Sequence, residues 1–234
     1  MQNILAVDTS TENCSVAVLT RQGIFFESKI APQKHADLVL AMTDTVLQKA
    51  GIKRENLNGI VYGMGPGSFT GVRIAASTAQ GLALGLDLKV VGVSSLEALA
   101  YQALEGCDEE YAVAAIDARM GEVYVAVFRR RGSGLQKLEA EQVLKPEDAL
   151  SLVKKAVGGN HAVGGGSGLE ILYAAGLNKN VRKRSHFPDA EFIVKIGSSR
   201  FDENGSFDPC EALPLYVRNE VAWKKVDEQR KTTV

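Results

Sequence analysis

Short apolar runs separated by turns open the chain. They lie at residues 4–7, 16–19 and 25–30, with a polar turn at residues 9–13 and Gly23 between them. Runs of this length, bounded by turn residues, are typical of β-strands. The pattern therefore predicts a meander of three short strands.

From residue 35 to residue 50 the apolar positions follow the helical period instead. One stripe carries four of them, Leu38, Val39, Met42 and Val46. Leu40 and Leu47 lie outside this stripe, so the helix is apolar over more than one face. We expect a helix that is covered on two sides.

Strands and helices alternate through the rest of the first half. Residues 59–63 predict a buried strand, and after a glycine-rich turn a helix is expected from about residue 72 to residue 84, with Thr70 as its N-cap. Residues 90–93 predict the next strand. Residues 96–104 predict another helix, for which Ser94 or Ser95 is a suitable N-cap.

The second half repeats the beginning of the first. The offset that carries Asp8 onto Asp117 also carries Val16-Ala17-Val18 onto Val125-Ala126-Val127 and Gly23 onto Gly132. A match of strand, turn, strand and turn without a gap favours an internal duplication. We therefore expect an α/β fold of two βββαβα lobes, at residues 1–105 and 106–223, followed by a polar tail at residues 224–234.

Further elements of the second half are less regular. Helices are expected at about residues 146–157 and 189–201, and a short strand lies within the glycine-rich sequence GGNHAVGGGSG. The polar tail, which ends in RKTTV, is expected to fray.

Charge and cysteine content narrow the class of protein. The 27 Lys and Arg residues nearly balance the 28 Asp and Glu residues, so no overall field attracts nucleic acid or an anionic membrane. Three widely spaced cysteines, Cys14, Cys107 and Cys210, fit a reducing compartment better than a disulfide framework. The start of the chain lacks the basic and apolar regions of a signal peptide, and no apolar run of about 18 residues follows. We expect a cytoplasmic protein without membrane insertion.

Asp8, Thr9 and Ser10 come where a strand ends and a tight turn begins. In that geometry backbone N–H groups and hydroxyls can bind a phosphate while a carboxylate holds Mg²⁺, as in the first phosphate loop of actin-like ATPases and sugar kinases. Alternatively, Asp8 bonds its own turn, as Asp and Thr often do. In the second repeat, Arg119 and Met120 stand where small hydroxyl residues would be expected of a second phosphate loop.

The sequence GMGPGSFTGVR, at residues 63–73, is the densest motif. Its glycines allow positive φ or close backbone approach, its proline fixes one φ, and the start of the next helix could bind an anion. No Gly-Lys-Ser/Thr follows, so the motif is not a Walker A loop. We interpret six residues as structural turn residues: Gly65, Pro66, Gly67, Ser68, Thr70 and Gly71.

The helix that follows is rich in Ala, Ser and Gly, which lets another helix approach closely. Together with the helix at residues 35–50, it predicts a helix pair that docks on a matching pair of another subunit. Packing within the lobe alone is the alternative. The candidate interface residues are His35, Leu38, Val39, Met42, Val46, Arg73, Ala76, Ser77, Gln80, Gly81 and Leu84.

Other chemistries find little support in the sequence. The three histidines, His35, His161 and His186, are not at i, i+4 spacing, and there is no HExxH or CxxC motif, so we expect no protein-encoded metal site. No GxSxG motif is present either. His35, at the start of a helix, is expected to be solvated or to cap the helix. We name no catalytic residue and no cofactor.

Five motifs together resemble the TsaB (YeaZ) family: ILAVDTS, GxGPGSFTGxR, VSSLEALA, IDARMGEVY and LPLYVRNEVAWKK. The resemblance covers almost the whole chain. It implies an actin-like (ASKHA, ribonuclease H-like) fold and a role in making N6-threonylcarbamoyladenosine beside the anticodon of tRNA. The implied partners are the catalytic paralogue TsaD and the ATPase TsaE, with a homodimer when the chain is alone and tRNA bound only through the complex.

The same resemblance implies that this subunit is not catalytic. TsaD-like sequences carry a metal-binding His pair where Ser95 and Leu99 stand in this chain, and these two side chains cannot hold the metal. It also implies that the interface uses the helices at residues 35–50 and 72–84. Two alternatives stay open: an actin-like ATP-dependent phosphotransferase with an adenosine pocket near residues 164–168, and a metallopeptidase.

Overall fold

A computed structural model describes residues 2–132, 134–202 and 205–218. The first half contains β1 (Ile4–Asp8), β2 (Asn13–Thr20), β3 (Gly23–Ile30), α1 (His35–Lys49), β4 (Gly59–Gly65), α2 (Phe69–Leu86), β5 (Val90–Ser94) and α3 (Ser95–Leu104). The second contains β6 (Tyr111–Arg119), β7 (Glu122–Arg131), β8 (Gly134–Lys137), β9 (Gln142–Leu144), α4 (Pro146–Val157), β10 (Ala162–Gly165), α5 (Gly168–Ala174), β11 (Val181–Ser185) and α6 (Ala190–Asp202).

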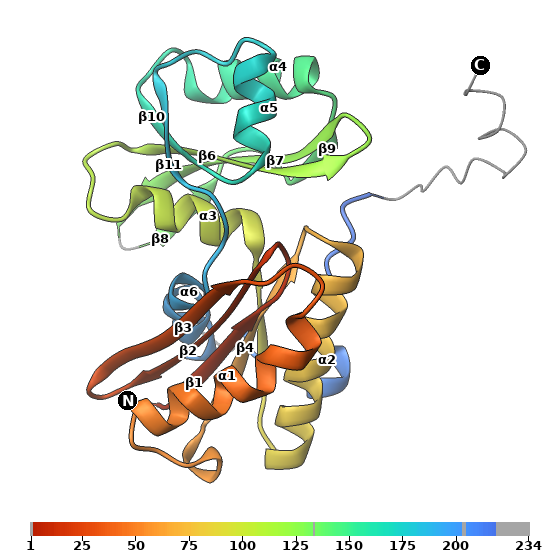
Figure 1. Ribbon diagram of the computed structural model, residues 1–234. Helices are drawn as coiled ribbons and strands as arrows, with labels where there is room; N and C mark the ends of the chain where they lie inside the picture. Colours follow the sequence, from red (N-terminus) through yellow and green to blue (C-terminus); the bar gives the residue numbers. More distant parts are fainter. Residues whose placement is uncertain (1, 133, 203–204, 219–234) are drawn as a thin grey trace, which may run out of the picture.

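The two halves build sheets with the same strand order. The first sheet runs β3-β2-β1-β4-β5, and the second runs β8-β7-β6-β10-β11, with β9 added on β7. In both sheets the meander is antiparallel and the later strands are parallel. This confirms the duplicated α/β fold, and each unit continues beyond βββαβα with one more strand and helix. Figure 1 shows the two units as two lobes.

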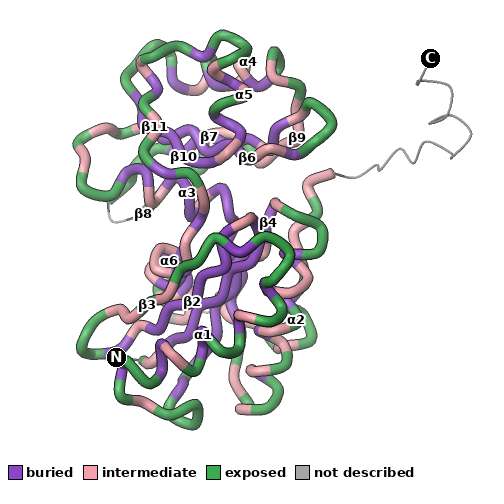
Figure 2. Tube along the Cα trace, in the orientation of Figure 1, coloured by how far each residue is buried: buried purple, intermediate pink, exposed green. Residues whose placement is uncertain are grey.

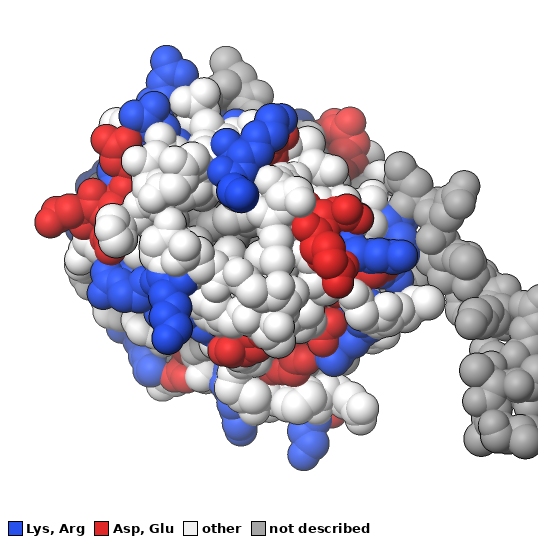
Figure 3. Space-filling model, turned by 90° about the horizontal axis from the view of Figure 1, so that it is seen from above, with Lys and Arg blue, Asp and Glu red and all other residues white. Residues whose placement is uncertain are grey.

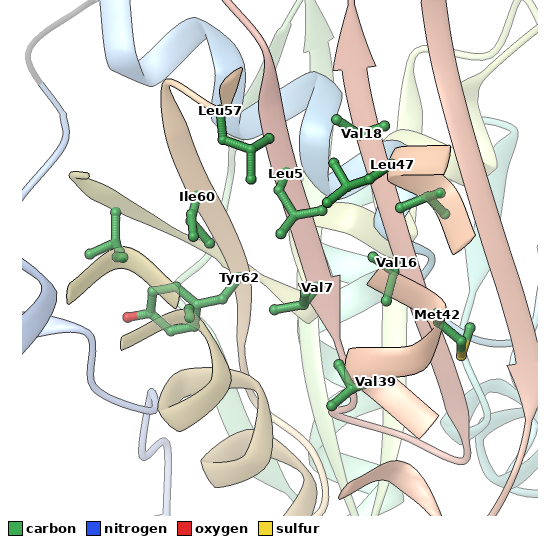
Figure 4. Packing of buried hydrophobic residues seen from close by; sticks show 14 of the residues in the cluster. Leu5, Val7, Val16, Val18, Val39, Met42, Leu47, Leu57, Ile60 and Tyr62 are labelled. Carbon is green, nitrogen blue, oxygen red and sulfur yellow. The ribbon is translucent and has the colours of Figure 1, made fainter. Parts of the chain in front are cut away.

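The helices α1 and α2 cover one face of the first sheet. In Figure 4 the side chains of Leu5, Val7 and Val16 on the strands meet Val39 and Met42 on α1. These side chains are buried, and the burial of one such residue contributes about 1.5–3 kcal/mol. The inner stripe of α1 is therefore part of the core of its own lobe, and buried residues concentrate along β1, β2 and β4 (Figure 2).

The last helix of each unit packs on the sheet of the other. The helix α3 contributes Leu96, Leu99 and Leu104 to a core cluster with β6, β7 and β10, while α6 contributes Ile193 and Val194 to a cluster with β1, β4 and β5. Figure 1 shows α6 beside the first sheet and α3 beside the second. The boundary at residue 105 stays a prediction, but the cores of the two halves are linked by this exchange.

Most predicted helices agree with the structure within two residues, but the start of α2 differs. The helix begins at Phe69, earlier than the expected residue 72, because Ser68 is the N-cap: its Oγ accepts a hydrogen bond from Gly71 N. Thr70 is therefore inside the first turn. Ser94, one of the two candidates, caps α3. The predicted tail at residues 224–234 lies outside the described residues.

Candidate functional site

The carboxyl group of Asp8 ends β1 in a buried position. Its Oδ1 accepts a hydrogen bond from Ser10 N at 3.2 Å, and its Oδ2 accepts one from Ser10 Oγ at 3.1 Å. Burial raises the pKa of Asp8 to about 7, although the hydrogen bonds from Ser10 favour the charged form and lower it. Asp8 therefore bonds its own turn, as in the second of the two sequence interpretations.

Thr9 and Ser10 also direct their hydroxyl groups into the protein. Thr9 Oγ1 donates to Gly71 O at 2.7 Å, and Ser10 Oγ accepts from Ser95 Oγ at 2.9 Å. Both residues are buried. A phosphate bound at this turn would have to displace these hydrogen bonds, so the turn as observed is built as a structural junction.

The corresponding turn of the second repeat is a tight hairpin between β6 and β7. Arg119 and Met120 adopt positive φ values of 63° and 55°. The guanidinium of Arg119 pairs with Asp117 Oδ2 and with Glu12 Oε1, each at 3.1 Å. Arg119 therefore neutralises its own turn and reaches across to the first.

A cleft of about 730 Å³ lies between the two turns. Its walls include Ser10, Pro66, Ile116 and Tyr124, and the segment at residues 215–218 lines it as well. That segment is tied to both lobes: Leu215 N donates to Met64 O at 2.7 Å, and Arg218 bonds Glu122 Oε2 at 2.5 Å. The end of the described chain thus forms one wall of the cleft.

The glycines of the GMGPGSFTGVR motif serve two different purposes. Gly65 has a φ of +98°, as the sequence argument allowed. Gly67 and Gly71 do not have positive φ. They are required for close approach, because a Cβ would lie 2.2 Å from Ser10 O and 2.0 Å from Thr9 O. The motif therefore lets the start of α2 contact the backbone of the β1–β2 turn.

Sequence reasoning did not single out Gly63. A Cβ at that position would lie 1.9 Å from Asp8 Oδ1, so the glycine makes room for the buried carboxyl group. The GxG spacing of Gly63 and Gly65 was visible in the sequence, but the neighbouring strand that brings Asp8 against it was not.

The predicted interface residues divide between the inside and the outside of the lobe. Five are buried in the chain itself: His35, Val39, Met42, Val46 and Ala76. Leu38 and Gln80 are half-buried, whereas Ser77, Gly81 and Leu84 are exposed on α2. The stripe that spacing identified on α1 faces the sheet with Val39, Met42 and Val46, and Ala76 of α2 packs in the same core. The exposed and half-buried residues are therefore the ones available to a partner.

Arg73 lies at the outer start of α2. Its guanidinium carbon is 3.3 Å from the centre of the Phe69 ring and 5.2 Å from that of Tyr216, and Nη1 donates to Phe69 O at 2.8 Å. Phe69 is 70% exposed. These three residues form a cation–π stack at the surface, which the sequence did not indicate because Tyr216 is distant along the chain.

The sequence predicts that His35 is solvated or caps the helix, and both predictions are wrong. His35 is buried, and its Nε2–H donates to Thr11 O at 2.6 Å. The first residue of α1 is thus attached to the same turn that contacts α2. The physical reason is that the helix begins directly against the β1–β2 turn, which shields the imidazole from water.

Within the part of the chain that the structure describes, no group of three or more His, Cys, Asp and Glu residues could hold a metal ion. None of the described helices combines the length and the apolar character needed to cross a bilayer. On the face shown in Figure 3, Lys and Arg are interspersed with Asp and Glu, so this face has no patch of a single charge.

Comparisons with known proteins agree with this architecture. The chain is 38% identical to the "tRNA threonylcarbamoyladenosine biosynthesis protein TsaB" of Escherichia coli, over 95% of this chain and 97% of that protein. The protein of the same name from Haemophilus influenzae is also 38% identical, over 97% and 98%. The chain belongs to the TsaB family. Residues 21–187 also match the family described as "TsaD: tRNA N6-adenosine threonylcarbamoyltransferase".

Solved structures of TsaB-like proteins share the fold. The structure of "YeaZ from Pseudomonas aeruginosa" superposes with a TM-score of 0.84 at 34% identity, over 92% of this chain and all of that one. A second Pseudomonas aeruginosa structure, of a protein "with similarity to peptidase YEAZ", gives a TM-score of 0.87 over 93% of this chain. The resemblance expected from the motifs is thereby confirmed, together with the actin-like fold.

Ser95 and Leu99 stand at the positions where the family resemblance implies the metal-binding pair of TsaD. Ser95 donates its hydroxyl hydrogen to Ser10, and Leu99 is buried in the core between α3 and the second sheet. Leu has no atom that can bind a metal ion, and the Ser hydroxyl is already hydrogen-bonded within the protein. In this TsaB-family chain, Ser95 serves internal hydrogen bonding and Leu99 serves core packing.

Proposed function

We propose that this chain is a non-catalytic subunit in the biosynthesis of threonylcarbamoyladenosine in tRNA, and that it supports TsaD in the cytoplasm. The pathway is taken from the near full-length similarity to TsaB proteins. The subunit role rests on one observation: the outer faces of α1 and α2 leave small and apolar residues uncovered on this chain. TsaE joins the complex, tRNA is bound through it, and the isolated chain forms a homodimer.

The exposed face of α2 supports close helix contact. Ser77, Gly81 and Gly85 are exposed, and a Cβ added at either glycine would meet no atom within 4 Å. Leu84, on the same helix, is 67% exposed, and Leu40 on α1 is 51% exposed. A small-residue surface flanked by uncovered leucines favours a partner helix packed at short distance, since burying such side chains stabilises a complex.

The internal contacts of Thr9, Ser10 and Leu99 support the non-catalytic assignment. The hydroxyls of Thr9 and Ser10 are hydrogen-bonded in the interior, and Leu99 replaces a potential metal ligand. These groups are already engaged in internal hydrogen bonds or in core packing, which does not suit a nucleophile or a base. We infer that the cleft side of this chain shapes the subunit while the reaction takes place on TsaD.

The substitution Gly81→Arg tests the proposed interface, with Gly81→Ala as the matched control. Gly81 is exposed with open space around it, so both variants should fold. We expect TsaD to be lost in co-purification with the Arg variant and retained with the Ala variant. Ala76 is unsuitable for this test because it is buried. Capture of TsaD by the Arg variant at the wild-type level would refute the proposed surface.

A phosphotransferase remains the second candidate, and one observation favours it: the cleft between the lobes is large enough for a nucleotide. Isothermal titration of the isolated chain with ATP and Mg²⁺ distinguishes the two. We expect no binding. A micromolar dissociation constant that is lost in Asp8→Asn would support the phosphotransferase instead.

A further inference from the structure

We propose that the turn between β1 and β2 positions α1 and α2 relative to each other. In this way the turn sets how tightly the outer faces of the two helices bind the partner. Thr9, Ser10 and Thr11 are the positioning residues. They belong to the turn that resembles a phosphate loop in sequence. The inference rests on the proposed function, because it assumes that the outer faces of α1 and α2 bind the partner.

The turn holds the start of α2 at three points. Thr9 Oγ1 donates to Gly71 O at 2.7 Å, and Ser68 N, at the N-cap, donates to Ser10 O at 2.7 Å. The third point is steric, since Gly67 and Gly71 let the helix approach to a distance that no side chain would allow. The first turn of α2 is thus fixed against the backbone of residues 9 and 10.

The same turn holds the start of α1. His35, the first residue of α1, donates its Nε2–H to Thr11 O at 2.6 Å, and Ala31 N donates to Glu12 O at 3.0 Å just before the helix. The N-cap residue Lys34 contributes no side-chain hydrogen bond to α1. Because both helices begin against consecutive residues of one turn, any shift of the turn changes the two helices together.

On its other side the turn contacts α3, which packs on the second sheet, and the β6–β7 hairpin of the second lobe. Ser95, the first residue of α3, donates its hydroxyl hydrogen to Ser10 Oγ at 2.9 Å. Glu12 pairs with Arg119 of the β6–β7 hairpin at 3.1 Å. The turn therefore lies between the helix pair and the cleft, and it provides a physical route by which the position of the second lobe affects the partner surface.

The decisive experiment compares Thr9→Val with Thr20→Val. Both threonines are buried, both donate Oγ1 to a glycine carbonyl, and both substitutions keep the side-chain shape. Thr20 ends β2 at the β2–β3 hairpin, and its hydroxyl bonds only within that hairpin among the described residues, to Gly23 O and from Gln22 N. Thr9→Ser keeps the hydroxyl and serves as the rescue variant.

We expect Thr9→Val to weaken binding to purified TsaD roughly tenfold, because a less fixed helix pair loses preorganisation. Thr20→Val and Thr9→Ser should stay within about twofold of wild type. Urea unfolding of all variants separates affinity from stability. A purely structural role of Thr9 would lower stability in both Val variants without this difference in affinity.

Three results overturn the inference. The turn does not position the interface if Thr9→Val binds TsaD as wild type does, or if both Val variants weaken binding equally. In either case the proposed function stands as long as Gly81→Arg abolishes binding. If Gly81→Arg itself leaves TsaD binding unchanged, the surface on α1 and α2 is wrong, and the positioning role falls with it.

Discussion

The Asp8 carboxyl group is buried beside Ser10 and Gly63, and no Lys or Arg among the described residues forms an ion pair with it. Burial raises its pKa to about 7, and the nearby charge of Asp189 adds to the increase. The sequence placed Asp8 at the end of a strand and at a turn. It could not show that Gly63, from a strand distant along the chain, leaves the room that the buried carboxyl group occupies.

The stability of the protein should therefore depend on the charge of Asp8. The folded state keeps a proton that the unfolded chain releases above pH 4, so the contribution of Asp8 is complete below that pH and is lost as the pH rises toward 7. Between about pH 5 and pH 7.5, wild type should lose about 2–3 kcal/mol of unfolding free energy relative to Asp8→Asn.

Urea unfolding of both proteins at several pH values measures this difference. The Asn variant stays neutral, so all other titrating groups cancel in the comparison. Parallel curves for wild type and variant across this range would show that Asp8 is ionised in the folded protein.

Helix α2 combines two kinds of glycine that the sequence alone does not distinguish. Gly71 lies against Thr9 O, whereas Gly81 is exposed to open space. Composition correctly indicated a small-faced helix and periodicity correctly indicated α1, but neither revealed which stripe faces the sheet. Spacing alone predicts an interface role for Val39, Met42 and Val46, because an apolar stripe looks the same whether a sheet or another subunit covers it.

Alanine at these two positions should have opposite effects. Gly71→Ala forces α2 away from the β1–β2 turn and should destabilise the protein by about 2 kcal/mol or more. Gly81→Ala should stabilise it by about 0.5–1 kcal/mol, because alanine is the better helix former and meets no neighbour. Denaturant unfolding compares the two directly. Equal stability of the two variants would contradict the difference in packing.

An ion pair links the two exchanged helices across the molecule. Arg200 on α6 binds both carboxylate oxygens of Glu97 on α3, at 2.6 and 2.7 Å, and donates to Gly92 O at 3.0 Å. The duplication was readable from the repeated strands and turns. The exchange of α3 and α6 was not, because the helices look alike in sequence whichever sheet they cover.

A double-mutant cycle on Arg200 and Glu97 measures how strongly this link couples the lobes. We expect a coupling energy of about 1–3 kcal/mol, since both side chains are partly buried and Nη2 of Arg200 contacts both carboxylate oxygens of Glu97. The exposed pair Arg129 and Glu110 provides the comparison and should give less than about 0.5 kcal/mol. Similar values for the two pairs would mean that the Arg200–Glu97 contact contributes no more than a surface ion pair.

The exchange of α3 and α6 also has a consequence for how the protein is made. During synthesis from the N-terminus, the strands β1 to β5 leave the ribosome well before residues 190–202, yet α6 supplies most of the side chains that cover one face of their sheet. Until then Ile4, Ala6 and Val61 lack their final neighbours on that face, and α3 awaits the second sheet. The first lobe therefore completes its packing only after the second has been synthesised.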